Sequence, residues 1–172
     1  MITIETDADG EWDSSTDWGA LAERAARAAV AASRARPLLD SALAVEISVK
    51  FTTDADVQAL NAAYRNKDKS TNVLSFPMID AELLASLYSA DSGEILLGDV
   101  VLARGVCAAE AAGRGITVEA HASHLVVHGV LHLLGYDHEA SDEEAEEMEK
   151  AEREALASLD ISDPYSVTEV QS

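Results

Sequence analysis

The sequence predicts an α+β fold, in which a small mixed sheet of about four strands is covered by about five helices. Strand-like and helix-like segments are interspersed without the strict strand–helix–strand rhythm of a parallel α/β sheet. The length of 172 residues fits one domain, and an apolar content of 48% is enough to form a core. We expect this domain to cover residues 1–160 and the polar residues 161–172 to form a flexible C-terminal tail.

Four segments have the pattern of β-strands. Residues 2–6 and 43–51 alternate apolar and polar side chains, which is typical of strands with one buried face. Residues 71–77 end at Pro77, which suits an edge strand or the end of a strand. Residues 94–103 form a buried run in which Gly98 predicts a bend or bulge. The segment between the last two, residues 80–93, is expected to be irregular.

Five segments have the composition and the boundaries of helices. The first is rich in alanine and is expected to continue until Pro37 ends it. Thr53, Thr117 and Ser141 stand where N-cap residues are needed, each with an acidic residue in the following turn. The expected helices cover residues 17–36, 53–66, 104–112, 117–134 and 141–159.

Several classes of protein are excluded by composition. No apolar run reaches the ~18 residues that a membrane span requires, and residues 1–12 lack the basic and apolar regions of a secretory signal. Cys107 is the only cysteine, so no internal disulfide and no four-cysteine zinc site is expected. A cytoplasmic protein is the simplest interpretation.

The charge is strongly acidic, with 12 basic against 32 acidic residues and a net charge of −20. This balance argues against nonspecific binding of nucleic acids. Residues 142–154 carry a local charge of −6, which we interpret as a solvated helix face; a docking surface for basic ribosomal proteins is the alternative. Residues 65–69 form a basic island in which Arg65, Lys67 and Lys69, with Asp68 between them, give a local charge of +2; a solvated, lysine-rich turn is the alternative interpretation.

The spacing of three histidines predicts a metal site. His128 and His132 are four residues apart, so they lie on the same face of a helix. Gly135 follows where the helix would need a residue with positive φ to end, and His138 comes three residues later. A chain that turns back at Gly135 would bring three imidazoles to one point, as in an open, catalytic zinc site.

Two further histidines extend this stripe along an otherwise apolar helix. His121 and His124 precede His128 at helical spacing, and buried imidazoles must pair, open on a cleft or bind a metal ion. Of the two, His124 is the better candidate for lining a substrate cleft, because it lies one turn before His128; packing or capping is an equally good interpretation. Asp137 either orients a ligand imidazole or stabilises the turn.

The spacing matches the metzincin motif H-E-x-x-H-x-x-G-x-x-H except at its second position. Gly129 occupies the place of the glutamate that serves these proteases as general base. A metal ion would still acidify a bound water, so a hydrolase remains possible while a protease is disfavoured. If the basic island faces the metal, Arg65 would clamp a phosphate.

Three segments together resemble the YbeY family of bacterial endoribonucleases and rRNA maturation factors. They are residues 60–77, 96–103 and 124–149, and the one departure near them is Ser70, where the family usually has proline. The resemblance implies one zinc ion per chain, held by His128, His132 and His138, and a functionally important arginine at Arg65. It also implies cleavage of single-stranded RNA in 16S rRNA 3′-end maturation and ribosome quality control. The implied partners are rRNA, the small ribosomal subunit and its assembly factors.

The leading hypothesis is therefore a zinc-dependent endoribonuclease with His128 and Arg65 in its catalytic centre. Lys67, Lys69 and His124 are the candidate RNA contacts. The attacking group would be either metal-bound water or the RNA 2′-hydroxyl. The alternatives are a metalloprotease and a non-catalytic ribosome assembly factor with a structural zinc ion, although three ligands leave an open position that structural sites usually lack.

Overall fold

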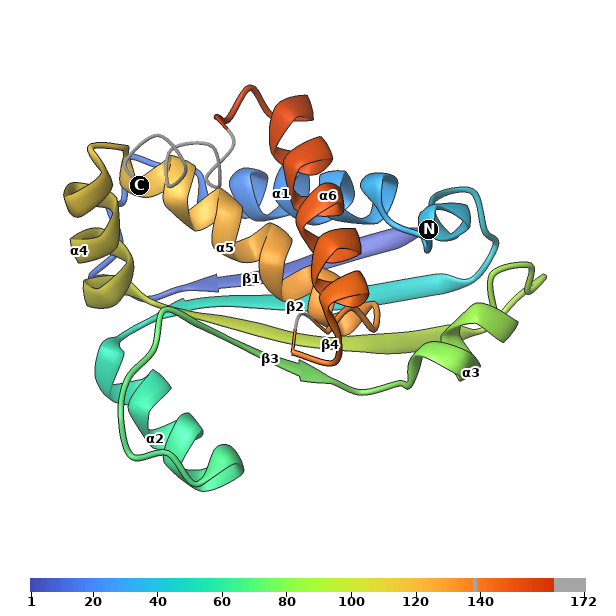
Figure 1. Ribbon diagram of the computed structural model, residues 1–172, viewed down its shortest axis with the longest axis horizontal. Helices are drawn as coiled ribbons and strands as arrows, with labels where there is room; N and C mark the ends of the chain where they lie inside the picture. Colours follow the sequence, from blue (N-terminus) through green and yellow to red (C-terminus); the bar gives the residue numbers. More distant parts are fainter. Residues whose placement is uncertain (138, 163–172) are drawn as a thin grey trace.

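A four-stranded mixed sheet forms the centre of the molecule in the computed structural model, which describes residues 1–137 and 139–162 (Figure 1). The strand order is β1-β2-β4-β3; the first three are parallel, and β3 is an antiparallel edge strand. This confirms the expected strands, including the edge position of the one that ends at Pro77. The strands are β1 (Ile2–Ala8), β2 (Ala44–Thr52), β3 (Val73–Pro77) and β4 (Glu94–Ala103).

Helices cover the sheet unequally on its two faces. α1, α5 and α6 lie over one face, and α2 lies against the other face beside β3 and β4 (Figure 1). The described residues thus form one α+β domain, as the sequence predicted. Its helices are α1 (Trp18–Ala32), η1 (Arg36–Leu39, a 3-10 turn), α2 (Asp54–Arg65), α3 (Ala81–Ser86), α4 (Arg104–Arg114), α5 (Val118–Leu133) and α6 (Asp142–Ser158).

The helix starts follow the capping residues. The hydroxyls of Thr53, Thr117 and Ser141 accept hydrogen bonds from backbone N–H groups three residues later, in the first turns of α2, α5 and α6. These bonds satisfy N–H groups that have no partner within the helix. The three expected starts are therefore confirmed.

Two sequence predictions about boundaries were wrong. α1 ends at Ala32 instead of Arg36, because Ser33 is extended and its hydroxyl donates to the Val30 carbonyl. Pro37 then lies inside the short turn η1. The segment 80–93, expected to be irregular, contains α3, whose first turn is capped by the Asp80 carboxylate accepting from Leu83 N–H.

The bulge expected at Gly98 is present in β4. Glu46 pairs with Leu96 and Ile47 pairs with Gly98, so Leu97 is the additional residue. Gly98 has φ +152°, and a Cβ at this position would clash with Leu133 and with the backbone of Phe76. The bulge therefore lets the edge strand and the end of α5 approach β4 closely.

α5 runs through the centre of the apolar layer and contacts α1, α4, α6, β3 and β4. It packs tightly against the sheet at Gly129, where a Cβ would lie 2.6 Å from Cγ1 of Val100. On the opposite face of the sheet a smaller core joins Val57 of α2 to Leu74 and Val101. The two cores hold α5 and β3 in fixed positions relative to each other.

The C-terminal part of the expected tail, residues 163–172, lies outside the described residues, so its flexibility stays a prediction. Among the helices that the structure describes, none has both the length and the apolar character needed to cross a lipid bilayer.

Candidate active site

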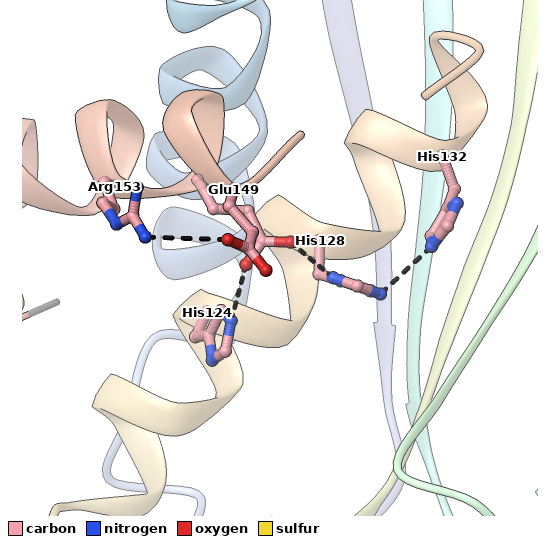
Figure 2. A network of polar contacts seen from close by, with 6 residues as sticks. His124, His128, His132, Glu149 and Arg153 are labelled. Carbon is pink, nitrogen blue, oxygen red and sulfur yellow. Dashed lines mark hydrogen bonds and ion pairs between the residues drawn. The ribbon is translucent and has the colours of Figure 1, made fainter. Parts of the chain in front are cut away.

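Two imidazoles of α5 point at each other across one helical turn. The Nε2 atoms of His128 and His132 are 3.0 Å apart, and their rings are nearly perpendicular, with an interplanar angle of 78° (Figure 2). The four-residue spacing places both side chains on the same face of the helix, as the sequence predicted.

The other nitrogen of each ring is held by an acceptor. Nδ1–H of His128 donates to Oε1 of Glu152 over 2.6 Å, and Nδ1–H of His132 donates to the Tyr136 carbonyl over 2.9 Å. These bonds fix the tautomer, so that Nε2 carries the lone pair in each neutral ring. Two converging lone pairs repel each other unless a proton or a cation lies between them.

The separation of the two nitrogens fits a shared metal ion. Imidazole nitrogens that bind one tetrahedral zinc ion at about 2.0–2.1 Å are about 3.3 Å apart. Metal-binding histidines also donate their second N–H to a carboxylate or a carbonyl, which is what His128 and His132 do here. The pair can therefore hold a divalent ion through Nε2.

The turn after α5 positions the acceptor for His132. Gly135 has φ +100°, as expected for the residue that ends this helix, and Tyr136 N–H donates to the Leu131 carbonyl. The Tyr136 ring is anchored from a distant segment, since its hydroxyl accepts from Arg34 N–H and the Arg34 guanidinium lies 4.1 Å from the ring centroid. The Tyr136 carbonyl is thereby held beside His132.

The third expected ligand, His138, lies outside the described residues, and its role stays a prediction. Within residues 1–137 and 139–162, no group of three or more potential metal ligands is present. Asp137 stabilises the turn, because its Oδ1 accepts from Glu139 N–H at 2.9 Å, and its role in orienting a ligand imidazole stays a prediction.

Glu152 of α6 is the site residue that sequence reasoning missed. Its side chain is 1% exposed and joins two histidines, with Oε1 accepting from His128 and Oε2 accepting from His124 over 3.0 Å. Burial alone would raise the pKa of this carboxyl, but the hydrogen bonds from His124 and His128 outweigh it and lower the pKa to about 2. Glu152 is thus a buried carboxylate that stays ionised.

The interpretation of the acidic residues 142–154 as a solvated helix face was wrong at Glu152. The buried residues of α6 follow helical spacing, so one face packs on the domain while most of its acids point outward. Glu152 falls on the buried face, and an acid at such a position must be paired. That placement is the signal that could have identified it: the buried residues are Met148, Ala151, Glu152, Ala155 and Leu156.

A cleft of about 630 Å³ opens in front of the histidine pair. Arg65, the last residue of α2, lines this cleft together with His128 and His132, so the condition that the basic island faces the histidines is met for Arg65. Asn66 ends α2 in the left-handed conformation, with φ 57°, and starts the connection to β3. The described lining includes neither Lys67 nor Lys69, whose side chains are exposed.

The remaining histidines lie along α5 on the far side of His128. Nε2 of His124 is bonded to Glu152, and Nε2 of His121 lies 2.8 Å from Oε1 of Glu110. Both rings line a second cavity, of about 370 Å³, which also contains part of His128. The expectation that His124 lines a cleft thus concerns this second cavity, while His121 is a buried, paired residue.

The cleft combines converging imidazole nitrogens with an arginine, which is the site chemistry of metal-assisted hydrolases. Comparison with known proteins agrees with this class. Residues 9–160 match the family model described as Endoribonuclease YbeY. The endoribonuclease YbeY of Rhizorhabdus wittichii is 52% identical over 98% of this chain and 99% of that protein, and that of Sphingopyxis alaskensis is 51% identical over 96% and 98%. The chain belongs to the YbeY family.

A solved structure supports the fold. The solution structure of a Thermotoga maritima protein aligns with a TM-score of 0.54 and 24% identity, over 95% of this chain and 98% of that one. At this identity the likeness concerns the fold alone.

Proposed function

We propose that this protein is a zinc-dependent endoribonuclease that cleaves single-stranded RNA during maturation of the 16S rRNA 3′ end. Membership of a family whose model and relatives are named endoribonucleases makes the chain a hydrolase that acts on RNA. Its proposed partners are rRNA, the small ribosomal subunit and its assembly factors, in the cytoplasm. The proposed zinc ligands are His128, His132 and His138.

The observation that carries the metal-dependent mechanism is the convergence of two Nε2 atoms, 3.0 Å apart, in a cleft that Arg65 also lines. A bound zinc ion would supply Lewis-acid chemistry, polarising the scissile phosphate and acidifying water. Arg65 offers a planar, permanently charged group that forms paired hydrogen bonds to phosphate oxygens. Its charge would oppose the negative charge that develops on the phosphate during cleavage.

The surrounding residues hold the reactive atoms in place. Glu152 and the Tyr136 carbonyl keep the Nδ1 protons of His128 and His132, so both Nε2 lone pairs stay directed at the same point. Because Glu152 is ionised and buried, it is a strong hydrogen-bond acceptor for Nδ1–H of His128. The Gly135 turn prevents the second imidazole from rotating away from the first.

The close packing at Gly129 explains why the motif lacks the glutamate of the proteases. A side chain at this position would begin 2.6 Å from Val100, so α5 could not carry a glutamate without moving away from the sheet. The metalloprotease alternative thus lacks both the base and the space for it. The non-catalytic alternative is disfavoured because a purely structural zinc ion needs neither an open cleft nor Arg65 in its wall.

The net charge of −20 requires that RNA binding be local. Arg65 lines the cleft, and Lys67 and Lys69 are exposed and follow Arg65 within four residues of the chain, so the basic island would provide a cationic approach to the site. We therefore keep Lys67 and Lys69 as proposed contacts for the flanking phosphates.

The proposal is tested by assaying purified protein on single-stranded RNA, duplex RNA and casein, with a chelator and with added zinc. We expect cleavage of the single strand alone, its loss on chelation and its recovery with zinc. Casein digestion would favour the protease, and cleavage of nothing would favour the assembly factor.

Arg65→Ala tests the cleft more sharply. We expect folding and zinc content to stay unchanged while RNA cleavage falls by about 10²–10³-fold, as on loss of one group that stabilises transition-state charge. Arg24→Ala, which removes an exposed arginine of α1 far from the cleft, is the matched control and should cleave normally. Cleavage by Arg65→Ala at the wild-type rate would remove Arg65 from the mechanism.

A further inference from the structure

The second cavity adjoins the candidate active site and shares one proposed ligand, His128, with it. It has a volume of about 370 Å³ and lies between α4, α5 and the start of β3. It shares Asn72, Val73 and His128 with the first cleft. A polymeric ligand bound over His128 can therefore extend from one cavity into the other. Its size is within the range of small-molecule sites.

A polar network forms one wall of this cavity. Oε1 of Glu110 accepts from Nδ2 of Asn72 over 3.0 Å, and Nε2 of His121 lies 2.8 Å from the same oxygen. The Glu110 side chain remains 40% exposed, so its carboxylate can accept further hydrogen bonds from a ligand. Asn72 and His121 thus hold an accessible carboxylate at a fixed position.

Buried polar atoms beside the cavity lack partners. Burial lowers the pKa of His121, which favours the neutral ring, with Nε2–H donating to Glu110 and Nδ1 as an acceptor. His121 is 4% exposed, and within the described part of the chain its Nδ1 and that of His124 have no hydrogen-bond partner. Buried polar atoms that lack a hydrogen-bond partner are uncommon and often belong to a ligand site.

An arginine completes the cavity. Arg114, the last residue of α4, lines it and forms no ion pair with any residue that the structure describes. Arg65 lines the first cleft in the same way, so each of the two cavities that meet at His128 contains an arginine. In a chain with a net charge of −20, this arrangement suits a polyanion that passes through both cavities.

We propose that the second cavity is a subsite for one nucleotide of single-stranded RNA, adjacent to the phosphate that is cleaved beside His128. Val73 and Leu125 contact the base or the ribose, and Arg114 binds the phosphate of this nucleotide. The Glu110 carboxylate repels phosphate, so it faces the donor groups, accepting from the 2′-hydroxyl or from an amino group of the base. The subsite rests on the proposed endoribonuclease function.

Gly113 allows the cavity to be filled without disturbing the fold. It lines the cavity in the last turn of α4, and a Cβ there would meet no atom within 4 Å. Gly113→Phe should occupy the subsite, while Gly113→Ala is the matched control.

With oligoribonucleotides cut at one defined bond, we expect Gly113→Phe to lower kcat/KM for a hexanucleotide by about tenfold, the worth of one base contact. For the corresponding dinucleotide, kcat/KM should fall less. Adding a nucleotide on one side of the cleaved bond should no longer accelerate cleavage by Gly113→Phe.

A second pair of variants tests the charge. In Arg114→Gln, an added nucleotide should likewise no longer raise kcat/KM. Arg104→Gln, which changes an exposed residue at the start of the same helix, should keep the wild-type dependence on substrate length. Zinc content should be unchanged in all four variants, because none alters a proposed ligand.

Binding separates failure of the subsite from failure of the proposed function. Fluorescence anisotropy with a nuclease-resistant phosphorothioate oligoribonucleotide, which keeps its 2′-hydroxyls, measures the subsite without cleavage. Weaker binding to Gly113→Phe and Arg114→Gln than to their controls would support the subsite even if the wild type cleaves no RNA. Equal affinity and equal length dependence in all variants would overturn it, whether or not the wild type is a nuclease.

Discussion

Two histidines of α5 that lie seven residues apart, His121 and His128, are each paired with a carboxylate. The two pairs differ in which imidazole nitrogen is hydrogen-bonded to the carboxylate. Glu110 is paired with Nε2 of His121, and Glu152 accepts from Nδ1 of His128. The Glu110 side chain is 40% exposed, whereas that of Glu152 is 1% exposed. In the first pair, a buried Nδ1 is thus left without a hydrogen-bond partner among the described residues. In the second pair, Nε2 is directed into a cleft.

This difference shows that histidine spacing alone does not define a metal ligand. His121, His124, His128 and His132 share one stripe of α5, but only the last two donate through Nδ1 and converge through Nε2. The distant acceptors, one on α6 and one in the turn after α5, decide which ring nitrogen is left for a metal ion.

The largest expected difference between the pairs is in metal binding. His128→Ala should lose the zinc ion and the RNA cleavage together, by more than the ~100-fold typical of residues that only support a ligand. His121→Ala should retain zinc, since its Nε2 is directed to Glu110. Metal analysis and cleavage assays on the same samples measure this; zinc loss from His121→Ala would abolish the distinction.

The supporting carboxylates should differ next. Glu152→Gln replaces an anion that accepts from two histidines by a neutral amide with one acceptor oxygen, so zinc affinity should fall by about 10–100-fold. Competition with a chelator gives the affinity. Glu110→Gln is the control and should keep the wild-type value.

Glu152 also gives the stability of the fold a pH dependence of known sign. Its pKa is lowered from its ordinary value of 4.5 to about 2 in the folded protein, so its ionised form stabilises the fold fully above pH 4.5. This contribution is lost as the pH falls from 4.5 toward 2. In metal-free protein, the difference in unfolding free energy between wild type and Glu152→Gln should shrink over that range; a constant difference would contradict the assignment.

Gly129 sets the distance between α5 and the sheet beside His128. Gly129→Ala introduces a Cβ 2.6 Å from Val100 and should lower the free energy of unfolding by about 1–3 kcal/mol. Gly113→Ala, where the same methyl group meets no atom within 4 Å, should be neutral or slightly stabilising. Urea unfolding of both variants provides the measurement, and equal midpoints would mean that α5 can move away from the sheet at little cost.

The smallest effect concerns Cys107, which lies one turn before Glu110 on α4. Burial raises the pKa of its thiol to about 12, and the negative charge of Glu110 contributes. The native thiol should therefore react with a disulfide reagent at pH 8 far more slowly than the thiol of unfolded protein. Glu110→Gln should accelerate this reaction slightly, and Glu152→Gln should not.

Local signals explain what the sequence predicted correctly. The caps of α2, α5 and α6, the positive φ of Gly135 and the facing of His128 and His132 each depend on residues within a few positions. The first helix was overextended because alanine favours helix, while the competing hydroxyl of Ser33 acts through its own backbone.

Tertiary contacts explain what the sequence did not predict. Glu152 resembles the other acids of α6 until α6 packs on α5, and only its place on the buried face distinguishes it. Likewise, Arg65 reaches the cleft because the chain leaves α2 at Asn66 and returns along β3. Neither arrangement follows from spacing within one segment.

The alternation of side chains along β3 connects one wall of the cleft to the core on the other face of the sheet. Val73, Ser75 and Pro77 line the cleft, while Leu74 and Phe76 between them belong to the core under α2. A slip of one residue along β4 would exchange the two sets, so the packing of α2 fixes the register of the wall opposite the histidines. Damage to that distant core would misplace the wall and leave both imidazoles where they are, so metal capture and substrate alignment can fail separately.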